Sequence, residues 1–231
     1  MPFFFDPTFV ILIPAILLSI YAQMRVQSTY SKYSGVVSSS RLSGAAVARQ
    51  ILAQRGLTDV RVEMTQGTLS DHYDPRARVL RLSPGVYNGN SLAALGVAAH
   101  ETGHALQHDE GYVPLQLRAS FMPLASIGSM AAFPLLLIGI LMANQTLAMI
   151  GVYAFALVVL FYLVTLPVEY NASSRALAML ADGGYLTRSE IEPTKQVLNA
   201  AALTYVAAAL TAVLNLVRLL LIAGMAGGRD E

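Results

Sequence analysis

The sequence contains no cysteine, and only 13% of its 231 residues are charged. Without cysteine the chain forms no disulfides, iron–sulfur clusters, thiolate zinc sites or cysteine nucleophiles, so a bound metal needs His, Asp or Glu as ligands. Soluble domains carry roughly 25% charged residues, and about half that fraction argues against an ordinary water-soluble globule. The formal net charge of +1 gives no indication of nucleic-acid binding.

In place of charge the chain has long apolar stretches, and its mean hydropathy is +0.54. About 20 helical residues cross the roughly 30 Å hydrocarbon core of a bilayer. Residues 121–143, 147–168 and 197–217 are uncharged over that length, and a shorter stretch, 9–24, comes first. No Lys or Arg precedes this first stretch, as one would in a secretory signal, so we predict a retained N-terminal anchor. The pattern predicts a mainly α membrane protein with about four transmembrane helices.

The basic residues predict the orientation of these helices. Ten of them lie between the first and second apolar stretches and three between the third and fourth, whereas the N-terminal tail and residues 144–146 contain none. By the positive-inside rule, both long loops face the cytoplasm and both termini face outward. Arg25 and Arg118 carry most weight, because the rule applies best to residues beside the membrane.

The first long loop has the pattern of a small α+β domain. Ser43 is placed to cap a helix that ends at Gln54, before Gly56. Residues 59–64 and 77–82 alternate apolar and polar side chains in the manner of half-buried strands, and turn-forming residues separate them.

A further helix is predicted from Asn90 or Ser91 through Gln107, and it contains the HExxH pattern His100-Glu101-Thr102-Gly103-His104. Four residues advance a helix by about 400°, so the two imidazoles project from one face within reach of one ion. Glu101 lies beside them, where it can bind a water held by the metal. In a shuffled sequence of this composition the pattern would arise by chance with a probability of roughly 0.002.

A catalytic zinc needs three protein ligands and one open position for water. His108 lies one turn beyond His104, but a straight helix places it about 6 Å further along the axis, too far to share a site with His100. Glu169 follows the third apolar stretch, and two membrane crossings separate it from His104, so the two residues face the same compartment. We predict Glu169 as the third ligand and keep His108 as the alternative.

Four segments of the chain resemble the bacterial membrane-bound neutral zinc metallopeptidases of the YugP type, which are gluzincin-like enzymes. They are residues 98–108 with the HExxH helix, 69–75 (LSDHYDP), 166–176 (LPVEYNASSRA) and 201–208 (AALTYVAA). The similarity extends over nearly the whole chain. It implies one catalytic Zn²⁺ held by His100, His104 and Glu169, with Glu101 as the catalyst.

The chain departs from the wider gluzincin pattern at Ser173, where those proteases usually carry Asp four residues after the ligand Glu. A carboxylate that orients a zinc histidine must then come from elsewhere, and Asp71, Asp74 and Asp182 are the candidates. The resemblance also implies that the strand before the zinc helix, within residues 76–83, presents a free edge on which an extended peptide pairs.

The organisation that follows is a small cytoplasmic α+β zincin-like domain inserted between the first and second membrane helices. The expected segments are an anchor (1–24), the zincin-like domain with its HExxH helix (25–120), transmembrane helices 2 and 3 (121–168), a cytoplasmic helical segment with the third ligand (169–196), and transmembrane helix 4 with the C-terminal tail (197–231).

The expected reaction is peptide hydrolysis by a zinc-activated water, with Glu101 as the general base. The oxyanion also needs a donor. His72 and Arg175 are the predicted catalytic candidates, and Tyr73 and Tyr112 are further ones. Alternatively, His72 only caps its own turn, and Arg175 pairs with an acidic neighbour or a lipid phosphate.

The substrate is expected to be a polypeptide, either a membrane protein or a juxtamembrane segment, because Glu169 lies at the end of an apolar stretch. Thr211, Asn215 and Arg218 form a polar stripe on the fourth stretch, which predicts self-association or a membrane-protein partner. Alternatively, Arg218 only extends to the outer headgroups. Two other functions compete with this interpretation. One is an intramembrane site-2-type protease, and the other is a non-catalytic scaffold with a structural zinc.

Overall fold

The computed structural model describes residues 7–227, and residues 1–6 and 228–231 lie outside the description. The beginning of the predicted anchor and the end of the predicted tail are therefore outside the described residues. The chain forms two compact units. The apolar unit comprises the described residues up to Tyr21, residues 116–166 and the described residues from Thr204 onward. The α+β unit comprises residues 22–115 and 167–203.

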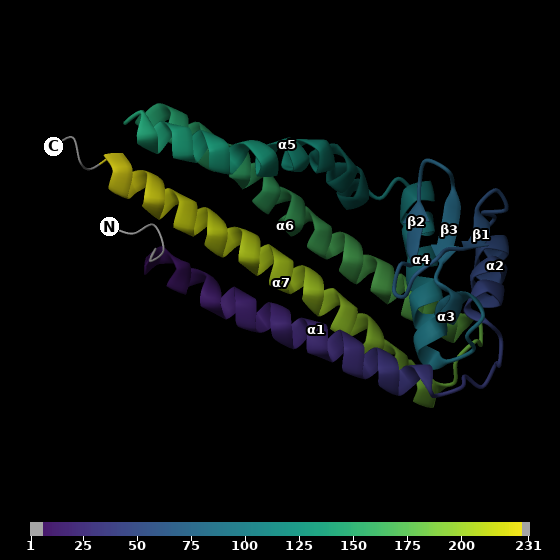
Figure 1. Cartoon of the computed structure of the whole chain (residues 1–231). Coiled ribbons are helices and arrows are strands. Elements are labelled where there is room, and N and C mark those ends of the chain that lie inside the picture. Colours follow the sequence, from purple (N-terminus) through teal and green to yellow (C-terminus); the bar gives the residue numbers. More distant parts are fainter. Residues whose placement is uncertain (1–6, 228–231) are drawn as a thin grey trace. The chain divides into compact units, whose positions relative to one another are not determined.

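Four helical segments of the described chain are long and apolar enough to cross a membrane. They are η1 (Pro7–Leu12) continued by α1 (Ile13–Ser34), α5 (Val113–Leu141), α6 (Gln145–Asp182) and α7 (Arg188–Gly227) (Figure 1). Each contains one of the four apolar stretches predicted from the sequence. The only exception within the described residues is the end of stretch 121–143, whose last two residues lie in a turn after α5. Three of the helices run well past the apolar stretches, and their polar ends belong to the α+β unit.

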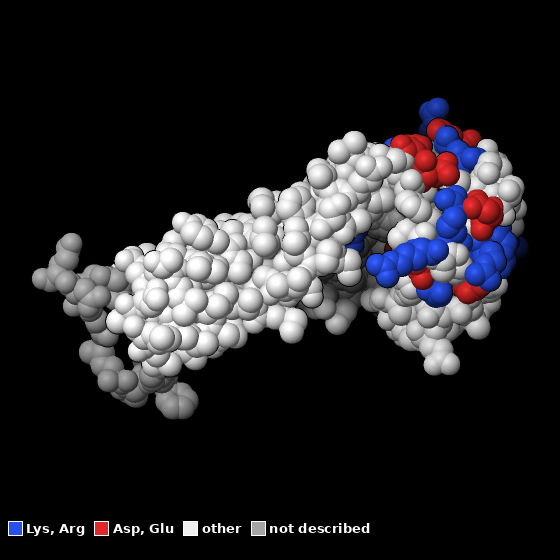
Figure 2. All heavy atoms as spheres, turned by 90° about the horizontal axis from the view of Figure 1, so that it is seen from above, with Lys and Arg blue, Asp and Glu red and all other residues white. Residues whose placement is uncertain are grey.

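The charged side chains are distributed unequally between the two units. Arg118 and Arg218 are the only charged residues in the described part of the apolar unit. In Figure 2, Lys, Arg, Asp and Glu side chains gather over the α+β unit. Arg218 Nε donates a hydrogen bond to the Thr8 hydroxyl, at 3.2 Å, so one residue of the predicted polar stripe has a partner within its own chain.

The remaining elements of the α+β unit are short. They are α2 (Gly44–Gln54), β1 (Arg61–Met64), β2 (His72–Asp74), β3 (Val79–Leu82), α3 (Pro84–Tyr87) and α4 (Leu92–Asp109). The predicted starts of both helices are confirmed, because Ser43 caps α2 and Ser91 caps α4 through their hydroxyl groups, whereas α4 ends at Asp109, two residues beyond the predicted Gln107. Gly56, just beyond α2, adopts a φ of +76°, which glycine accepts without strain.

The three strands form a sheet in the order β1-β3-β2. β1 runs parallel to β3, which pairs on its other side with the antiparallel β2. The expectation of a free edge on the strand before the zinc helix is therefore wrong, because β3 is the central strand. β2 is an edge strand of this sheet and lies among residues that the sequence indicated as turn formers.

The core of the α+β unit draws on both long loops. Buried Ile51, Leu80 and Leu95, from α2, β3 and α4, share one cluster with Leu180 and Leu198, from α6 and α7. The helical segment after the third apolar stretch is therefore part of the same unit as the sheet and α4. This packing brings the end of α6 against the helix that carries HExxH.

Candidate metal centre

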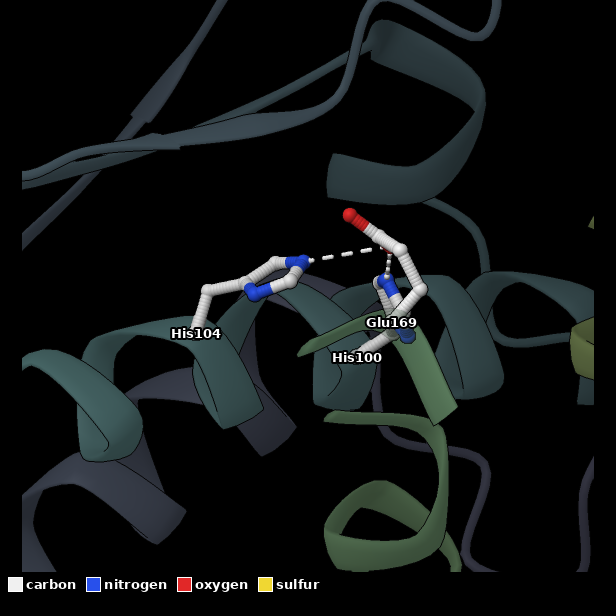
Figure 3. Close-up of side chains that lie close together, drawn as sticks. All are labelled: His100, His104 and Glu169. Atoms are coloured by element: carbon white, nitrogen blue, oxygen red, sulfur yellow. Dashed lines mark ion pairs between the residues drawn. The ribbon is translucent and has the colours of Figure 1, made fainter. Parts of the chain in front are cut away.

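His100 and His104 project from one face of α4 toward Glu169 on α6 (Figure 3). Their ligand atoms lie within 4.8 Å of one another. Glu169 Oε2 is 3.3 Å from His100 Nε2 and 3.6 Å from His104 Nε2. Two atoms bound tetrahedrally to one zinc at 2.0–2.1 Å are about 3.3 Å apart, so Glu169 lies from each histidine at close to the spacing of two ligands of one zinc.

Burial and charge at the cluster also fit a cation. The Glu169 side chain is 2% exposed, and the two imidazoles retain an exposed edge of 14% and 13%. Burial alone lowers the pKa of His104, but the hydrogen bond to Glu169 and the negative charges of Glu101 and Glu169 raise it above its usual value. A donor set of two imidazoles and one carboxylate is a common catalytic zinc set.

A glycine inside the motif sets the distance between the two helices. A Cβ on Gly103 would lie 2.8 Å from the carbonyl oxygen of Ala172 on α6. Real Cβ atoms do not approach a carbonyl that closely, so only glycine permits this packing. The contact holds α4 against the turn of α6 that begins at Glu169, and it explains one of the two unspecified positions of HExxH.

The Nδ1 atoms of the two histidines contact neutral side chains rather than carboxylates. Ser173 Oγ lies 3.1 Å from Nδ1 of His100, and Gln107 Oε1 lies 3.0 Å from Nδ1 of His104. The expectation that a carboxylate from elsewhere in the chain orients one of these histidines is wrong, because the Ser173 hydroxyl and the Gln107 amide occupy those positions.

The three aspartates considered for that role lie elsewhere. Asp71 accepts hydrogen bonds from the backbone N–H and the hydroxyl of Ser83, Asp74 binds Arg81 and the turn that follows β2, and Asp182 ends α6. Burial raises the pKa of the Asp71 carboxyl, hydrogen bonds from Ser83 oppose that rise, and the negative charge of Glu101 adds to it. Asp71 therefore interacts with the site through its charge.

Glu101 is buried, with 9% of its surface exposed, on the helix that carries the two histidines. It is not a member of the three-residue metal cluster. Its negative charge is one of the causes that raise the pKa of His104. A buried carboxylate beside the ligands, and not among them, is the arrangement required of a general base.

The predicted oxyanion donors have partners of their own. His72 is exposed on β2, where its Nδ1 contacts the Ser70 carbonyl at 2.8 Å. Tyr73 contacts His108 at 2.9 Å, and His108 is not part of the metal cluster. The alternative noted for His72, a cap on its own turn, corresponds to this contact.

Arg175 also has the partner that its alternative interpretation named. Its Nη2 lies 2.7 Å from Glu110, and its Nε donates to Asn171 Oδ1 at 2.7 Å. The Tyr112 ring lies 6.0 Å from the guanidinium. Gln107 and Asn171, which connect Arg175 to the site, were missed by sequence reasoning, because a neutral amide in a helix gives no signal of its own.

Comparison with known proteins gives consistent findings. The family described as "Putative neutral zinc metallopeptidase" matches residues 8–224. A Bacillus subtilis (strain 168) protein named "Putative membrane protease YugP" is 48% identical over 219 residues, which cover 95% of this chain and 96% of that protein. No solved structure matches the chain.

Proposed function

The chain belongs to the neutral zinc metallopeptidase family that it matches over residues 8–224, and on this premise we propose that it is a membrane-anchored zinc metalloendopeptidase. It hydrolyses peptide bonds near the cytoplasmic face of the membrane. The observation that carries the proposal is the convergence of His100, His104 and Glu169, from two helices distant in sequence, with Glu169 Oε2 at 3.3 and 3.6 Å from the two imidazole nitrogens.

His100 and His104, through their Nε2 atoms, and Glu169, through its carboxylate, hold one Zn²⁺ in this proposal. Zinc, when bound, supplies the Lewis acidity that lowers the pKa of a water molecule to about 7. Glu101 accepts the proton of the attacking water and returns it to the leaving amine. His72 remains the proposed donor to the oxyanion, because it lies on β2, the edge strand proposed below to pair with the substrate. Arg175, the other predicted candidate, pairs with Glu110.

The substrate in this proposal is an extended segment of a membrane or juxtamembrane protein. β2 replaces the central β3 as the edge on which such a segment pairs through its backbone. Glu169 lies only three residues beyond the end of the apolar unit in the sequence, which favours substrates close to the bilayer. The positive-inside pattern supports a cytoplasmic site.

The competing functions are less well supported. An intramembrane protease needs HExxH within an apolar span, whereas α4 belongs to the α+β unit and is not one of the four apolar helices. A scaffold with a structural zinc has no use for a buried Glu101 beside its ligands.

The substitution Glu101→Gln tests the proposal. Purified in detergent, the variant is expected to retain stoichiometric zinc and to lose cleavage of a fluorogenic peptide mixture, because Glu101 handles the proton and does not bind the metal. Glu63→Gln, at an exposed ion pair with Arg61 on β1, is the matched control and should leave both unchanged. Wild-type protein that binds zinc but cleaves no peptide would favour the scaffold.

A further inference from the structure

Gln107 is a fully buried amide with no role in the reaction described above. It lies on α4 three residues after His104, and its side chain is 0% exposed. Its Oε1 lies 3.0 Å from His104 Nδ1, while its Nε2 donates to the Val168 carbonyl and to Asn171 Oδ1, both at 2.9 Å. A buried amide is costly unless its hydrogen bonds are made, and this one makes bonds in three directions.

These partners fix the orientation of the amide. The Val168 carbonyl can only accept a hydrogen bond, so it must face the NH₂ group of Gln107. The oxygen of Gln107 then faces His104, and Nδ1 of His104 must carry the hydrogen. A neutral imidazole with hydrogen on Nδ1 has its lone pair on Nε2, which is the nitrogen that points toward Glu169.

Asn171, on α6, is oriented in the same way. Arg175 Nε can only donate, so it fixes Oδ1 of Asn171 as the atom that faces both Arg175 and Gln107. Arg175 is itself held by Glu110, at the C-terminal end of α4. The hydrogen bonds therefore form a relay in which every donor and acceptor is fixed: His104 donates to Gln107, and both Gln107 and Arg175 donate to Oδ1 of Asn171.

The other metal histidine has no such constraint. Nδ1 of His100 contacts the hydroxyl of Ser173, which can donate or accept, so this contact does not select a tautomer. One imidazole of the site is thus preset for metal binding by its surroundings, and the other is free to adjust.

We propose that Gln107 is the positioning residue for His104, and that the relay from Arg175 through Asn171 presents the unprotonated Nε2 of His104 to the metal. The proposal rests on the metal site of the proposed function. In this proposal Arg175 orients Asn171, in place of the predicted contact with substrate.

The test measures zinc affinity by competition with a chromophoric chelator, on the purified full chain in detergent. Gln107→Leu removes the acceptor for His104 and is expected to weaken zinc binding about 10- to 100-fold, the usual range for residues that orient a metal ligand. Thr102→Val is the matched control, because Thr102 is equally buried on α4 but its hydroxyl donates to Ala98 of the same helix. Its zinc affinity should equal that of the wild type.

A conservative variant separates positioning from simple stability. Gln107→Glu keeps an oxygen for Nδ1 of His104 but turns a second oxygen toward the Val168 carbonyl. It should lower the melting temperature and yet recover most of the zinc affinity lost in Gln107→Leu. If affinity and melting temperature fall together in both variants, the role is structural and the proposal is wrong.

A double-variant cycle tests the relay itself. Arg175→Met should weaken zinc binding severalfold, and the double variant with Gln107→Leu should bind no more weakly than Gln107→Leu alone, because both act through one path. Effects that multiply would overturn the relay, and wild-type affinity in a folded Gln107→Leu protein would overturn the proposal. Wild-type protein that binds no zinc would refute the proposed function, and the relay with it.

Discussion

Two sets of polar side chains, one from each unit of the molecule, satisfy their hydrogen bonds in different ways. In the apolar unit, the hydroxyls of Thr165 and Thr211 donate to carbonyls four residues earlier in their own helices, at 2.7 and 2.8 Å. In the α+β unit, Gln107, Ser173 and Asp71 instead contact residues of other elements. A hydroxyl satisfied within its own helix says nothing about which helix lies beside it, whereas a contact between elements fixes their relative position.

The two kinds of hydrogen bond meet different requirements: satisfying polar groups away from water, and holding side chains in fixed positions. Where no water is available, a helix must satisfy its polar groups internally. Hydrogen bonds from a hydroxyl to a carbonyl of the same helix do this, and they do not depend on which helix packs beside it. Neighbouring helices then approach through small residues, as where a Cβ on Gly151 would lie 2.6 Å from the carbonyl of Ala132. A metal site needs atoms held to a fraction of an ångström, and bonds between elements provide that.

The largest expected effect is the loss of a ligand from the α+β unit. Glu169→Ala should weaken zinc binding by on the order of 100-fold or more, because it removes one of three donors, while the helix content measured by circular dichroism stays unchanged. Glu192→Ala, at an exposed glutamate on α7, is the control. Unchanged zinc affinity in Glu169→Ala would return His108 to consideration as the third ligand.

A pair of glycine substitutions compares the two units directly. Gly103→Ala forces a Cβ toward Ala172 and should destabilise the protein by about 1–3 kcal/mol, with weaker zinc binding, because α4 must move from α6. Gly224→Ala in α7 meets nothing within 4 Å and should be neutral or stabilise by up to about 1 kcal/mol. Thermal unfolding in detergent measures both, and equal destabilisation by the two variants would contradict the comparison.

Asp71 gives the third prediction, a dependence of stability on pH. Its raised pKa means that the folded state disfavours the charged carboxylate, so stability is lost as pH rises from the ordinary value of about 3.9 through the folded pKa. Asp71→Asn keeps an oxygen for the Ser83 N–H and removes the charge. The variant should melt above the wild type at neutral pH, and the difference should disappear on acidification below about pH 4. A difference independent of pH would show that charge is not the cause.

The smallest effect is expected in the apolar unit. Thr211→Val removes a hydroxyl whose bond is made within its own helix, so stability should change by no more than about 0.5 kcal/mol. Zinc affinity should not change at all. A large loss of stability would mean that the hydroxyl serves a second helix, and the contrast between the two units would weaken.

Much of the fold was predictable because local chemistry sets it. Ser43 and Ser91 cap their helices as the sequence indicates, and uncharged runs of about 20 residues fall within long helices. Strand β2 was missed, because three residues among turn formers do not show an alternating pattern. The central position of β3 was also missed, since strand order depends on contacts distant in sequence.

The sequence by itself determined most of the candidate metal centre, because HExxH spacing places two imidazoles on one helix face and the absence of cysteine leaves His or a carboxylate as the remaining ligand type. Only the tertiary structure decided what surrounds those ligands. Gln107 and Asn171 are 64 residues apart, and neither carries a charge or a motif that reveals the other. Their contact exists because Gly103 lets α4 approach α6 closely, and it is this approach that selects the hydrogen-bond partners of His104.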